Sequence, residues 1–436
     1  MSPSVAPGLV SERALEPERF AIGGVPPRFA ARPLDRDELC ELLRAAARDA
    51  LAVVPWGGAT ALPREAAPAR YDLAIDLGAL DRVIEYEPGD LTLTAECGVT
   101  LAALDAALAA RGQELPLEAA HAARATLGGT LAANASGPRR RRFGAPRDRI
   151  LGARFVLGDG TLVRTGGKVV KNVAGYGIHR LLCGSRGGLA IFVDASLKLL
   201  PAPAARAALI YEVDAGSLGD AARWSPFPRL EPAVLTIVGA AGARGGAGPL
   251  PGASGASPPE VPGARGGADP LPGASGGDGF WLAIGFEDDP PRIAELEAIT
   301  TRALGAPALK LEGADAEAVW QRLADLEDSG STRLTFVTAH NTPAALARWL
   351  GSPELGACVF HAPCGTLHVF PEPRRAQACV AELAALGFSL TRARGADVVA
   401  AIPPAAATKA LRGRVRAALD PGARFALGER WERSTG

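Results

Sequence analysis

The spacing of apolar positions in the first hundred residues changes from that of a helix to that of strands. An apolar stripe at helical spacing runs from Leu39 to Ala47, and Asp35 with Glu38 three residues on is typical of a helix start. Thr100 is predicted to cap a second helix, which ends at Gly112. Short apolar runs bounded by turn residues predict strands at 51–55, 73–77, 82–86 and 91–96. Helices and strands mixed in this way predict an α+β fold.

The rest of the chain continues this alternation. An Asp159-Gly160 step marks a hairpin turn. Two strands are expected to close the first domain before Pro201 and Pro203. Strands are predicted at 154–157, 190–193, 196–200, 233–238, 280–286 and 333–338, and helices at 291–304, 314–326 and 343–350.

Residues 240–279 differ from the rest of the chain in composition. GARGGAGPLPGASGA from Gly242 recurs almost unchanged as GARGGADPLPGASGG from Gly263. Such a segment has almost nothing to bury and cannot offset the entropy cost of ordering, so we predict a disordered surface loop. It separates the strands at 233–238 and 280–286, which we expect to pair.

Composition narrows the classes of function. Lys+Arg and Asp+Glu both number 47, and this balance gives no electrostatic reason to propose nucleic acid as a partner. The first residues lack the pattern of a signal peptide and no long apolar segment follows, which predicts a cytoplasmic protein. The cysteines show no CxxC pair, which argues against an iron–sulfur cluster, a zinc ribbon or a disulfide framework; they are Cys40, Cys97, Cys183, Cys358, Cys364 and Cys379.

Three glycine clusters are candidates for binding a diphosphate. They are Gly57-Gly58-Ala59-Thr60, Gly128-Gly129 and Gly187-Gly188, each beside a predicted strand or helix start. A diphosphate bound without Lys or Arg needs backbone N–H groups from turns where a Cβ atom would obstruct its approach. Any one cluster alone is more often an ordinary turn. No strand-GxGxxG-helix unit followed by an acid is convincing, so a Rossmann nicotinamide site is not expected.

In order along the chain these blocks resemble a known family. PWGGATAL, AECGVTLAALDAAL, ATLGGTLAANASGPRRRRFGAPRDRILGARFVLGDG and GGKVVKNVAGYGIHRLLCGSRGGLAIFVDASLKLLP look like the PCMH-type FAD-binding domain of the vanillyl-alcohol oxidase family. The linked SG…R…G…RD…LG and KVVKNVAGY stretches resemble the FAD-binding E subunit of glycolate oxidase. The resemblance implies an N-terminal extension (1–16), an FAD-binding domain (17–203), a second α+β domain (204–400) and a tail (401–436) that packs back on the FAD domain.

The resemblance also implies a set of cofactor-binding residues. The first glycine loop would wrap the diphosphate, the second block would lie along the flavin and diphosphate, and the third would supply backbone contacts on the far side. The implied residues are Pro55, Trp56, Gly57, Gly58, Ala59, Thr60, Thr126, Leu127, Gly128, Gly129, Ser136, Gly137, Gly184, Gly187, Gly188 and Ile191. Relatives with covalent FAD carry a histidine in the first loop, whereas this chain reads GGATAL, which implies non-covalent FAD.

The chain departs from the family pattern in the third block. Gly188, Ala190 and Asp194 replace the Thr, Gly and Glu of GSxGTLGVITE, and Gly177 replaces the Asp of KNVAGYD. A methyl group at Ala190, where backbone approaches the cofactor closely, would weaken the site.

The sequence assigns no catalytic residue, and His361, His368 and Arg430 are weak candidates. His361 and His368 have the spacing of HAGDGNLH in relatives that oxidise 2-hydroxy acids, but Pro363, Cys364 and Thr366 replace Gly, Asp and Asn. In an unbroken strand residues seven apart face opposite ways, so the imidazoles converge only if residues 363–365 break the strand. We interpret the stretch as structurally retained and predict no metal site. Arg430, like Arg424, could meet a substrate carboxylate in a tail that resembles DPxxxFNPGR, although an ordinary surface arginine is the stronger expectation.

Two groups of cations stay open between a structural and a functional interpretation. The Arg139–Arg142 run is either a solvated loop or a contact for an acidic partner subunit or a phosphate. Lys168, Lys171 and Asn172 are either surface groups or lie near the flavin ring.

The resulting hypothesis is an FAD-binding subunit of a glycolate oxidase-type complex that oxidises a small 2-hydroxy acid. The resemblance implies a second FAD-binding subunit and an iron–sulfur subunit as partners, through which the protein could lie at the inner face of the membrane. Two alternatives stay open: a stand-alone FAD-linked alcohol or hydroxy-acid oxidoreductase, and a scaffold subunit that has lost FAD.

Overall fold

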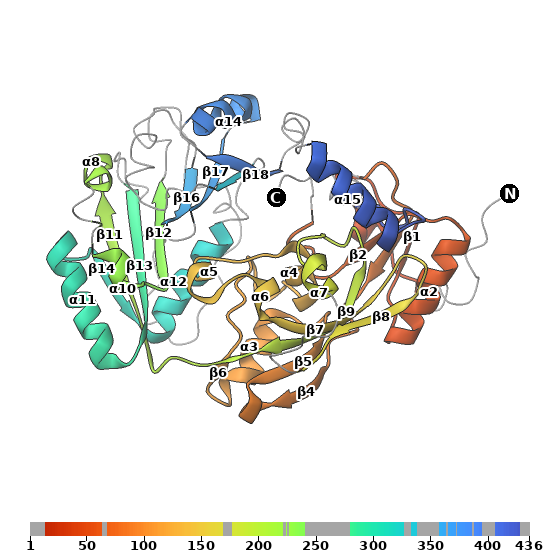
Figure 1. Cartoon of the computed structure of the whole chain (residues 1–436), viewed down its shortest axis with the longest axis horizontal. Helices are drawn as coiled ribbons and strands as arrows, with labels where there is room; N and C mark the ends of the chain where they lie inside the picture. The colour runs from red at the N-terminus through yellow and green to blue at the C-terminus, as the bar shows by residue number, and fades with distance from the viewer. Residues whose placement is uncertain are drawn as a thin grey trace. The chain divides into compact units, whose positions relative to one another are not determined.

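The fold is described from a computed structural model of the chain (Figure 1). Contacts divide the chain into two compact units, Met1–Ala202 with Ala400–Gly436 (unit 1) and Pro203–Val399 (unit 2). The predicted helix at 343–350 and the predicted disorder of 240–279 lie outside the described residues. The structure describes residues 14–62, 68–168, 177–220, 224, 226–239, 280–326, 333–337, 357–362, 365–371, 373–385, 388–394 and 406–427.

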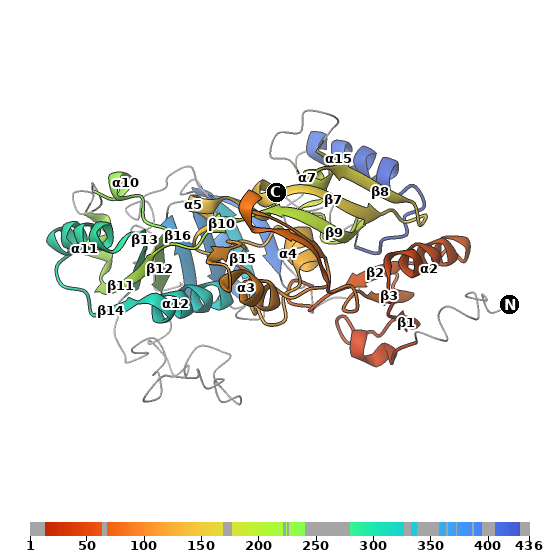
Figure 2. The same cartoon turned by 90° about the horizontal axis from the view of Figure 1, so that it is seen from below.

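Unit 1 begins with a small parallel sheet. Its strands are β1 (Phe29–Ala31), β2 (Val53–Trp56) and β3 (Leu73–Asp76), in the order β1-β3-β2, and Figure 2 shows helix α2 (Arg36–Arg48) beside them. The Asp35 carboxylate accepts hydrogen bonds from the N–H groups of Asp37 and Glu38, which confirms the predicted helix start. Buried leucines of α2 pack against this sheet and form its core.

A second, antiparallel sheet of unit 1 has the order β4-β5-β9-β7-β8. Its strands are β4 (Val83–Glu87), β5 (Thr92–Glu96), β7 (Ile150–Val156), β8 (Leu162–Gly166) and β9 (Ile191–Lys198). The prediction of two strands at 190–193 and 196–200 was wrong, because β9 continues through Asp194. The Asp194 carboxylate is buried and bonded to Arg154 Nε of β7 at 2.6 Å, so this polar residue does not interrupt the strand.

Short elements connect the two sheets of unit 1. Strands β6 (Gln113–Glu114) and β10 (Leu200–Pro201) pair with each other. Single 3-10 turns lie at Pro17–Phe20 and Pro88–Asp90. The helices are α3 (Leu101–Ala109), α4 (Leu127–Ala133), α5 (Arg140–Phe143), α6 (Pro146–Arg149), α7 (Ile178–Leu182) and α15 (Ala406–Leu419).

The chain after α15 returns to the parallel sheet of unit 1. Phe425 forms a parallel bridge with Val53 of β2, and the Ala426 N–H donates to the Val53 carbonyl at 2.9 Å. Phe425 and Leu427 are both buried. The last described residues therefore extend the edge of the sheet beside β2.

Unit 2 is built on an eight-stranded sheet in the order β14-β11-β13-β12-β16-β17-β15-β18. The predicted pairing of the strands that flank the insertion is confirmed, since Val234 lies opposite Gly285 and Gly239 opposite Phe280. The strands are β11 (Ala205–Val213), β12 (Val234–Gly239), β13 (Phe280–Asp288), β14 (Leu309–Glu312), β15 (Arg333–Val337), β16 (Ala357–His361), β17 (Thr366–Phe370) and β18 (Ser389–Arg394).

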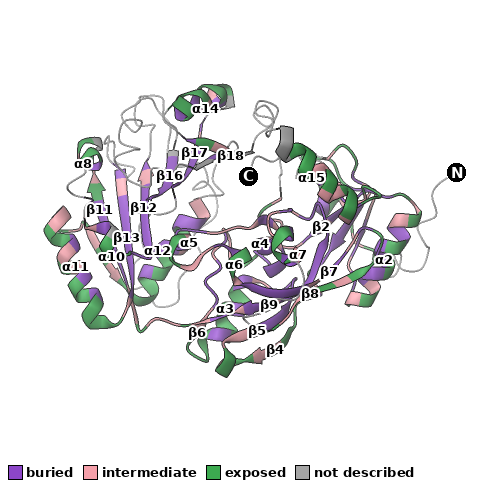
Figure 3. Ribbon diagram, in the orientation of Figure 1, coloured by how far each residue is buried: buried purple, intermediate pink, exposed green. Residues whose placement is uncertain are grey.

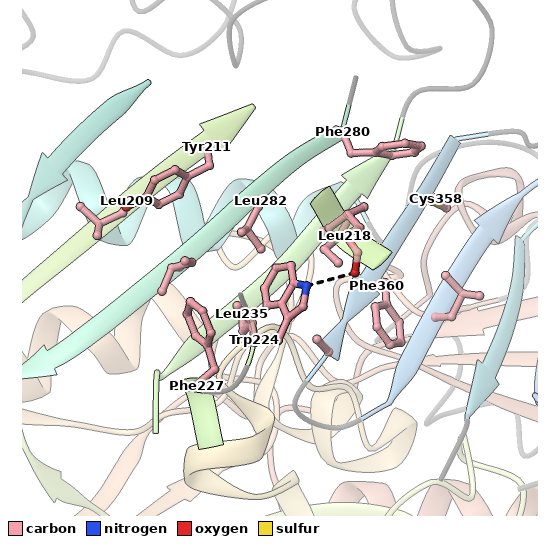
Figure 4. Close-up of a cluster of buried hydrophobic side chains, with 14 of the residues drawn as sticks. Leu209, Tyr211, Leu218, Trp224, Phe227, Leu235, Phe280, Leu282, Cys358 and Phe360 are labelled. Carbon is pink, nitrogen blue, oxygen red and sulfur yellow. Dashed lines mark hydrogen bonds between the residues drawn. The ribbon is translucent and has the colours of Figure 1, made fainter. Parts of the chain in front are cut away.

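Helices flank the sheet of unit 2. One core joins Trp224, Phe227 and Phe360 with α11 residues, and Figure 4 shows this cluster with the Trp224 Nε1 bond to the Leu218 carbonyl. A second core contains Trp320 of α12. Figure 3 shows β12 and β13 buried while α11 exposes many residues to solvent. The helices are α8 (Ala215–Gly219), α10 (Phe227–Leu230), α11 (Pro290–Leu304), α12 (Gly313–Leu326) and α14 (Ala376–Ala385), and a 3-10 turn lies at Pro373–Arg375.

Within the described residues no helix is long and apolar enough to cross a membrane.

Candidate cofactor site

A recess opens within unit 1 where the glycine clusters meet. It encloses about 840 Å³ of empty space, part of it open to solvent. We call it the glycine recess. Its described lining consists of Pro55, Trp56, Gly57, Gly58, Ala59, Thr60, Ala61, Leu62, Leu77, Cys97, Thr126, Gly128, Gly129, Ala132, Ala133, Arg186, Gly187, Ala190, Ile191, Phe192 and Leu427.

The recess brings together residues from all three predicted glycine clusters. Pro55, Trp56, Gly57, Gly58, Ala59, Thr60, Thr126, Gly128, Gly129, Gly187 and Ile191 line it. Leu127 instead points into the core of unit 1, where it is fully buried. Ser136, Gly137, Gly184 and Gly188 are not among the lining residues. The binding role of each of these residues stays a prediction.

The glycines in the walls are required by close approach of protein segments. A Cβ atom on Gly58 would lie 1.6 Å from the Arg124 carbonyl oxygen, and one on Gly187 would lie 2.5 Å from Pro55 Cγ. The sequence analysis explained these glycines by the space that a phosphate needs. The structure gives a second reason, because glycine also lets the walls of the recess pack against each other.

Helix α4 forms one wall of the recess. Thr126 Oγ1 accepts the Gly129 N–H at 3.2 Å, and the Gly128 N–H donates to the Cys97 carbonyl at 2.7 Å. Burial raises the pKa of the Cys97 thiol well above its ordinary value, with the nearby Asp194 acting in the same direction. Cys97 therefore presents a neutral thiol to the recess.

Three buried oxygen atoms near the end of α4 have no hydrogen-bond partner among the residues that the structure describes. They are Asn134 Oδ1, Ser136 Oγ and Ser185 Oγ. A Cβ atom on Gly184 would lie 3.6 Å from Asn134 Cβ, so the segments that carry these atoms are neighbours. Buried polar atoms of this kind are normally satisfied by a ligand or by water.

Two non-glycine residues of the lining have left-handed backbone conformations. Ala59 has a φ of 56° and Arg186 a φ of 54°, which are uncommon for residues with a Cβ atom and occur preferentially at functional sites. Ala190, by contrast, is not left-handed, so its methyl group causes no backbone strain of this kind. The glycine loops and the left-handed lining residues together fit a dinucleotide cofactor.

The two candidate histidines lie in unit 2 and converge. Strands β16 and β17 form an antiparallel pair in which His361 faces Thr366 and Val359 faces His368, so both imidazoles project from one face of the sheet. Their ring centroids are 5.7 Å apart. The sequence analysis required that the strand break between the two histidines. This condition is met, because β16 ends at His361 and β17 begins at Thr366.

Each imidazole is held by a threonine on the neighbouring strand. His361 Nδ1 lies 2.9 Å from Thr236 Oγ1, and His368 Nδ1 lies 3.1 Å from Thr335 Oγ1. The histidines are 2% and 6% exposed. Among the described residues no cluster of three or more His, Cys, Asp or Glu side chains could hold a metal ion.

The remaining candidate polar and charged residues differ from one another in burial and in their partners. Arg139 is buried and bonds to Glu118, whereas Arg141 and Arg142 are exposed. Lys168 pairs with Glu85. Arg430, Lys171 and Asn172 lie outside the described residues. The Arg424 N–H donates to Asp420 Oδ1 at 2.8 Å, within the tail.

Sequence reasoning missed several residues of the recess. Arg186 lies in a glycine block that the sequence did identify, in which Ala190 was already expected beside the cofactor, and Cys97 directly follows a predicted strand. The resemblance implied that the tail packs back on the FAD domain, but the position of Leu427 in the recess depends on the pairing of Phe425 with β2, which only the fold shows.

Comparisons with known proteins place an FAD binding domain in unit 1. Residues 27–166 match the family of the FAD binding domain. A stretch of 148 residues is 40% identical to the glycolate oxidase subunit GlcE of Escherichia coli, covering 34% of this chain and 42% of that subunit. A stretch of 184 residues is 31% identical to the glycolate oxidase subunit GlcD of Bacillus subtilis, covering 42% of this chain and 39% of that one.

Solved structures share the fold over most of the chain. An alkyldihydroxyacetonephosphate synthase matches with a TM-score of 0.63 at 16% identity, covering 93% of this chain and 77% of that one. A berberine bridge enzyme variant matches with a TM-score of 0.61 at 15% identity, covering 92% and 89%. These likenesses confirm the α+β, PCMH-type fold.

The chain thus carries an FAD binding domain, and FAD is its cofactor. The resemblance stated from the sequence is confirmed for this part of the chain. The chain spans less than half the length of the glycolate oxidase subunits that it matches.

Proposed function

We propose that the protein is the FAD-binding subunit of a glycolate oxidase-type complex that oxidises a 2-hydroxy acid to a 2-oxo acid. The observation that carries the proposal is the glycine recess, whose first two glycine clusters lie in the stretch that matches the FAD binding domain. The similarity to two glycolate oxidase subunits supports the substrate class.

The residues of the recess would hold FAD without a covalent bond. Bound FAD supplies the acceptor for the hydride that leaves C2 of a 2-hydroxy acid. The Gly57–Thr60 loop would offer backbone N–H groups to a diphosphate, whereas the N–H groups of Gly128 and Gly129 already donate within the wall of the recess, to the Cys97 carbonyl and to Thr126 Oγ1. No histidine is among the described lining residues, and the Cys97 thiol is held neutral. Acid precipitation should therefore release all flavin into the supernatant, and flavin in the pellet would contradict the non-covalent part.

The partners belong to the proposal. A second FAD-binding subunit and an iron–sulfur subunit would complete the complex and carry electrons away, with the chain in the cytoplasm. This arrangement predicts that the isolated chain binds FAD but reduces a dye with glycolate much more slowly than the complex.

A stand-alone hydroxy-acid oxidoreductase is the second candidate, and one observation favours it. His361 and His368 share a face of the unit 2 sheet, and each is oriented by a threonine. A histidine held in this way can serve as an acid–base group, whose loss typically costs about 10²- to 10⁴-fold in rate.

The two candidates are separated by glycolate-dependent dye reduction. The assay compares the isolated chain, the reconstituted complex, and each of them carrying His368→Ala, with flavin content measured in every sample. The subunit proposal expects activity from the complex alone and only a small effect of the substitution. Full activity of the isolated chain, abolished by His368→Ala at unchanged flavin content, would refute it in favour of the stand-alone enzyme.

A further inference from the structure

Trp56 is the last residue of β2, and its indole is held by a hydrogen bond from outside the glycine recess. Its Nε1–H donates to the Tyr71 hydroxyl at 2.7 Å, and that hydroxyl donates to the Phe20 carbonyl at 2.8 Å. All three residues are buried. Burial raises the pKa of Tyr71 well above its ordinary value, so the hydroxyl keeps the proton that it donates. We call these two linked hydrogen bonds the tyrosine bridge.

The tyrosine bridge requires a hydroxyl at its centre. An indole N–H can only donate and a peptide carbonyl can only accept, so the group between them must accept one hydrogen bond and donate the other. Without the Tyr71 hydroxyl, the indole N–H and the Phe20 carbonyl would both lose this partner in a buried position, where an unsatisfied polar group is costly. The rings of Phe20 and Trp56 also meet edge to face, with centroids 5.1 Å apart. Trp56 is therefore fixed against the turn at Pro17–Phe20.

The first glycine cluster is built on the same buried residues. Gly57 follows Trp56 directly in the chain. Ala59, within the loop, and Leu62, just after it, pack against the apolar cluster that contains the three residues of the tyrosine bridge. The Trp56 carbonyl also accepts the Leu77 N–H at 2.9 Å, which fixes the backbone where the loop begins. A change in the position of Trp56 would therefore move the loop.

We infer that Tyr71 is a positioning residue for FAD, which acts through Trp56 to hold the Gly57–Thr60 loop in the conformation that binds the diphosphate. Tyr71 itself is not among the described lining residues of the recess. A loop that is already ordered loses less conformational entropy when it binds a ligand, so the bridge raises affinity without a contact to FAD. The inference rests on the proposed role of this loop and not on the proposed substrate or partners.

Equilibrium binding to the full-length apoprotein tests the inference. Flavin fluorescence gives the dissociation constants for FAD and riboflavin, and calorimetry gives that for ADP, which carries the diphosphate without the flavin. Tyr71→Phe keeps the ring and removes the bridge, so it should weaken FAD and ADP binding about 3- to 10-fold and riboflavin binding by less than about twofold.

Tyr86→Phe is the matched control within unit 1. It also removes a tyrosine hydroxyl that is hydrogen-bonded to a side chain, Gln113 Oε1 at 3.0 Å, and Tyr86 does not line the recess. This variant should bind all three probes as the wild type does. A loss of FAD affinity equal to that of Tyr71→Phe would show that the bridge has no special role.

A double-mutant cycle determines whether Tyr71 acts through Trp56. Trp56→Phe removes the bridge from its other end, and it should show the same selective loss of FAD and ADP binding if Tyr71→Phe does not fold. In the Trp56→Phe background, Tyr71→Phe should weaken FAD binding by less than about twofold, whereas independent effects would multiply.

Three results would overturn the inference: unchanged FAD affinity in Tyr71→Phe, or in Trp56→Phe where only that variant folds; an equal loss for riboflavin; and losses that multiply in the cycle. Gly58→Ala, which perturbs the loop itself, separates these results from a failure of the proposed role of the loop. If Gly58→Ala leaves FAD and ADP binding unchanged, the loop does not bind the diphosphate and the inference fails with it. If Gly58→Ala weakens both while Tyr71→Phe does not, only the inference about Tyr71 fails.

Discussion

Replacing Arg139 with Met should destabilise unit 1 strongly, because it removes a buried cation from between two buried carboxylates. Arg139 Nε lies 2.8 Å from Glu118 Oε1, and its Nη1 lies 3.4 Å from Glu114 Oε2. The three side chains are only 9%, 10% and 13% exposed. The Arg139 N–H also donates to Glu118 Oε2 at 2.8 Å, so one carboxylate holds both the backbone and the side chain.

The magnitude follows from the charges left behind. Methionine is long enough to keep most of the contact with Phe143, whose ring centroid lies 5.3 Å from Arg139 Cζ. The loss is therefore mainly electrostatic, and removing one partner of a buried ion pair costs about 3–5 kcal/mol. For a unit of about 240 residues, each kcal/mol lowers the melting temperature by about 2–4 °C, so a drop of about 6–20 °C is expected.

Urea denaturation and thermal melting measure this effect, and a double-mutant cycle assigns it. Glu118→Gln should also destabilise, and the double variant Arg139→Met with Glu118→Gln should lose less than the sum of the single losses. Arg141→Met, at an exposed position two residues on, is the matched control and should change stability by less than about 0.5 kcal/mol. A loss below about 1 kcal/mol for Arg139→Met, or strict additivity in the cycle, would refute the buried-pair argument.

Three further predictions concern the recess, pH and the insertion. Gly58→Ala should weaken FAD binding at least tenfold in a fluorescence titration, because the added Cβ meets the Arg124 carbonyl, whereas Gly89→Ala has open space and should be neutral. Burial lowers the pKa of His179 below 6.5, so the stability contributed by the neutral ring is present above pH 6.5 and is lost as pH falls from 6.5 through the folded-state pKa. His179→Gln should therefore flatten the plot of urea midpoint against pH in that window. An unchanged slope would contradict this. Replacing residues 242–277 with a short Gly/Ser linker should leave flavin content and melting temperature nearly unchanged, and a loss of several degrees would contradict the predicted disorder.

Elements with one buried face could be predicted from the sequence. The stripe of α2 and its Asp35 cap, or the capping of α3 by Thr100, follow local rules that tertiary contacts reinforce. Strand β11 was missed, because Ala207 to Tyr211 are buried on both faces and show no alternation. A buried strand of this kind cannot be told from a helix by spacing alone.

Helix α4 shows why the recess was only partly predictable. The sequence indicated a glycine block there, and Gly128 and Gly129 disfavour a helix by propensity. The helix forms nonetheless, since Thr126 caps it, and glycine is needed at 128 because a Cβ atom there would lie 2.8 Å from Cys97 Cβ. The glycine block could therefore be predicted from residue type. The close packing of helix α4 on Cys97 could not, because these residues are distant in sequence.

The histidine pair shows a different case, in which the topology supplies contacts that residue identity could not indicate. The replacement of Asp by Cys364 argued that the stretch was only structural, since no third ligand or carboxylate partner was left in sequence. The structure supplies different partners from distant strands, Thr236 on β12 and Thr335 on β15. A hydroxyl, like a carboxylate, can fix the orientation of an imidazole ring by a hydrogen bond to Nδ1. Both rings are thus oriented by hydroxyl groups of distant strands, and the His368→Ala experiment decides whether that orientation serves catalysis or packing alone.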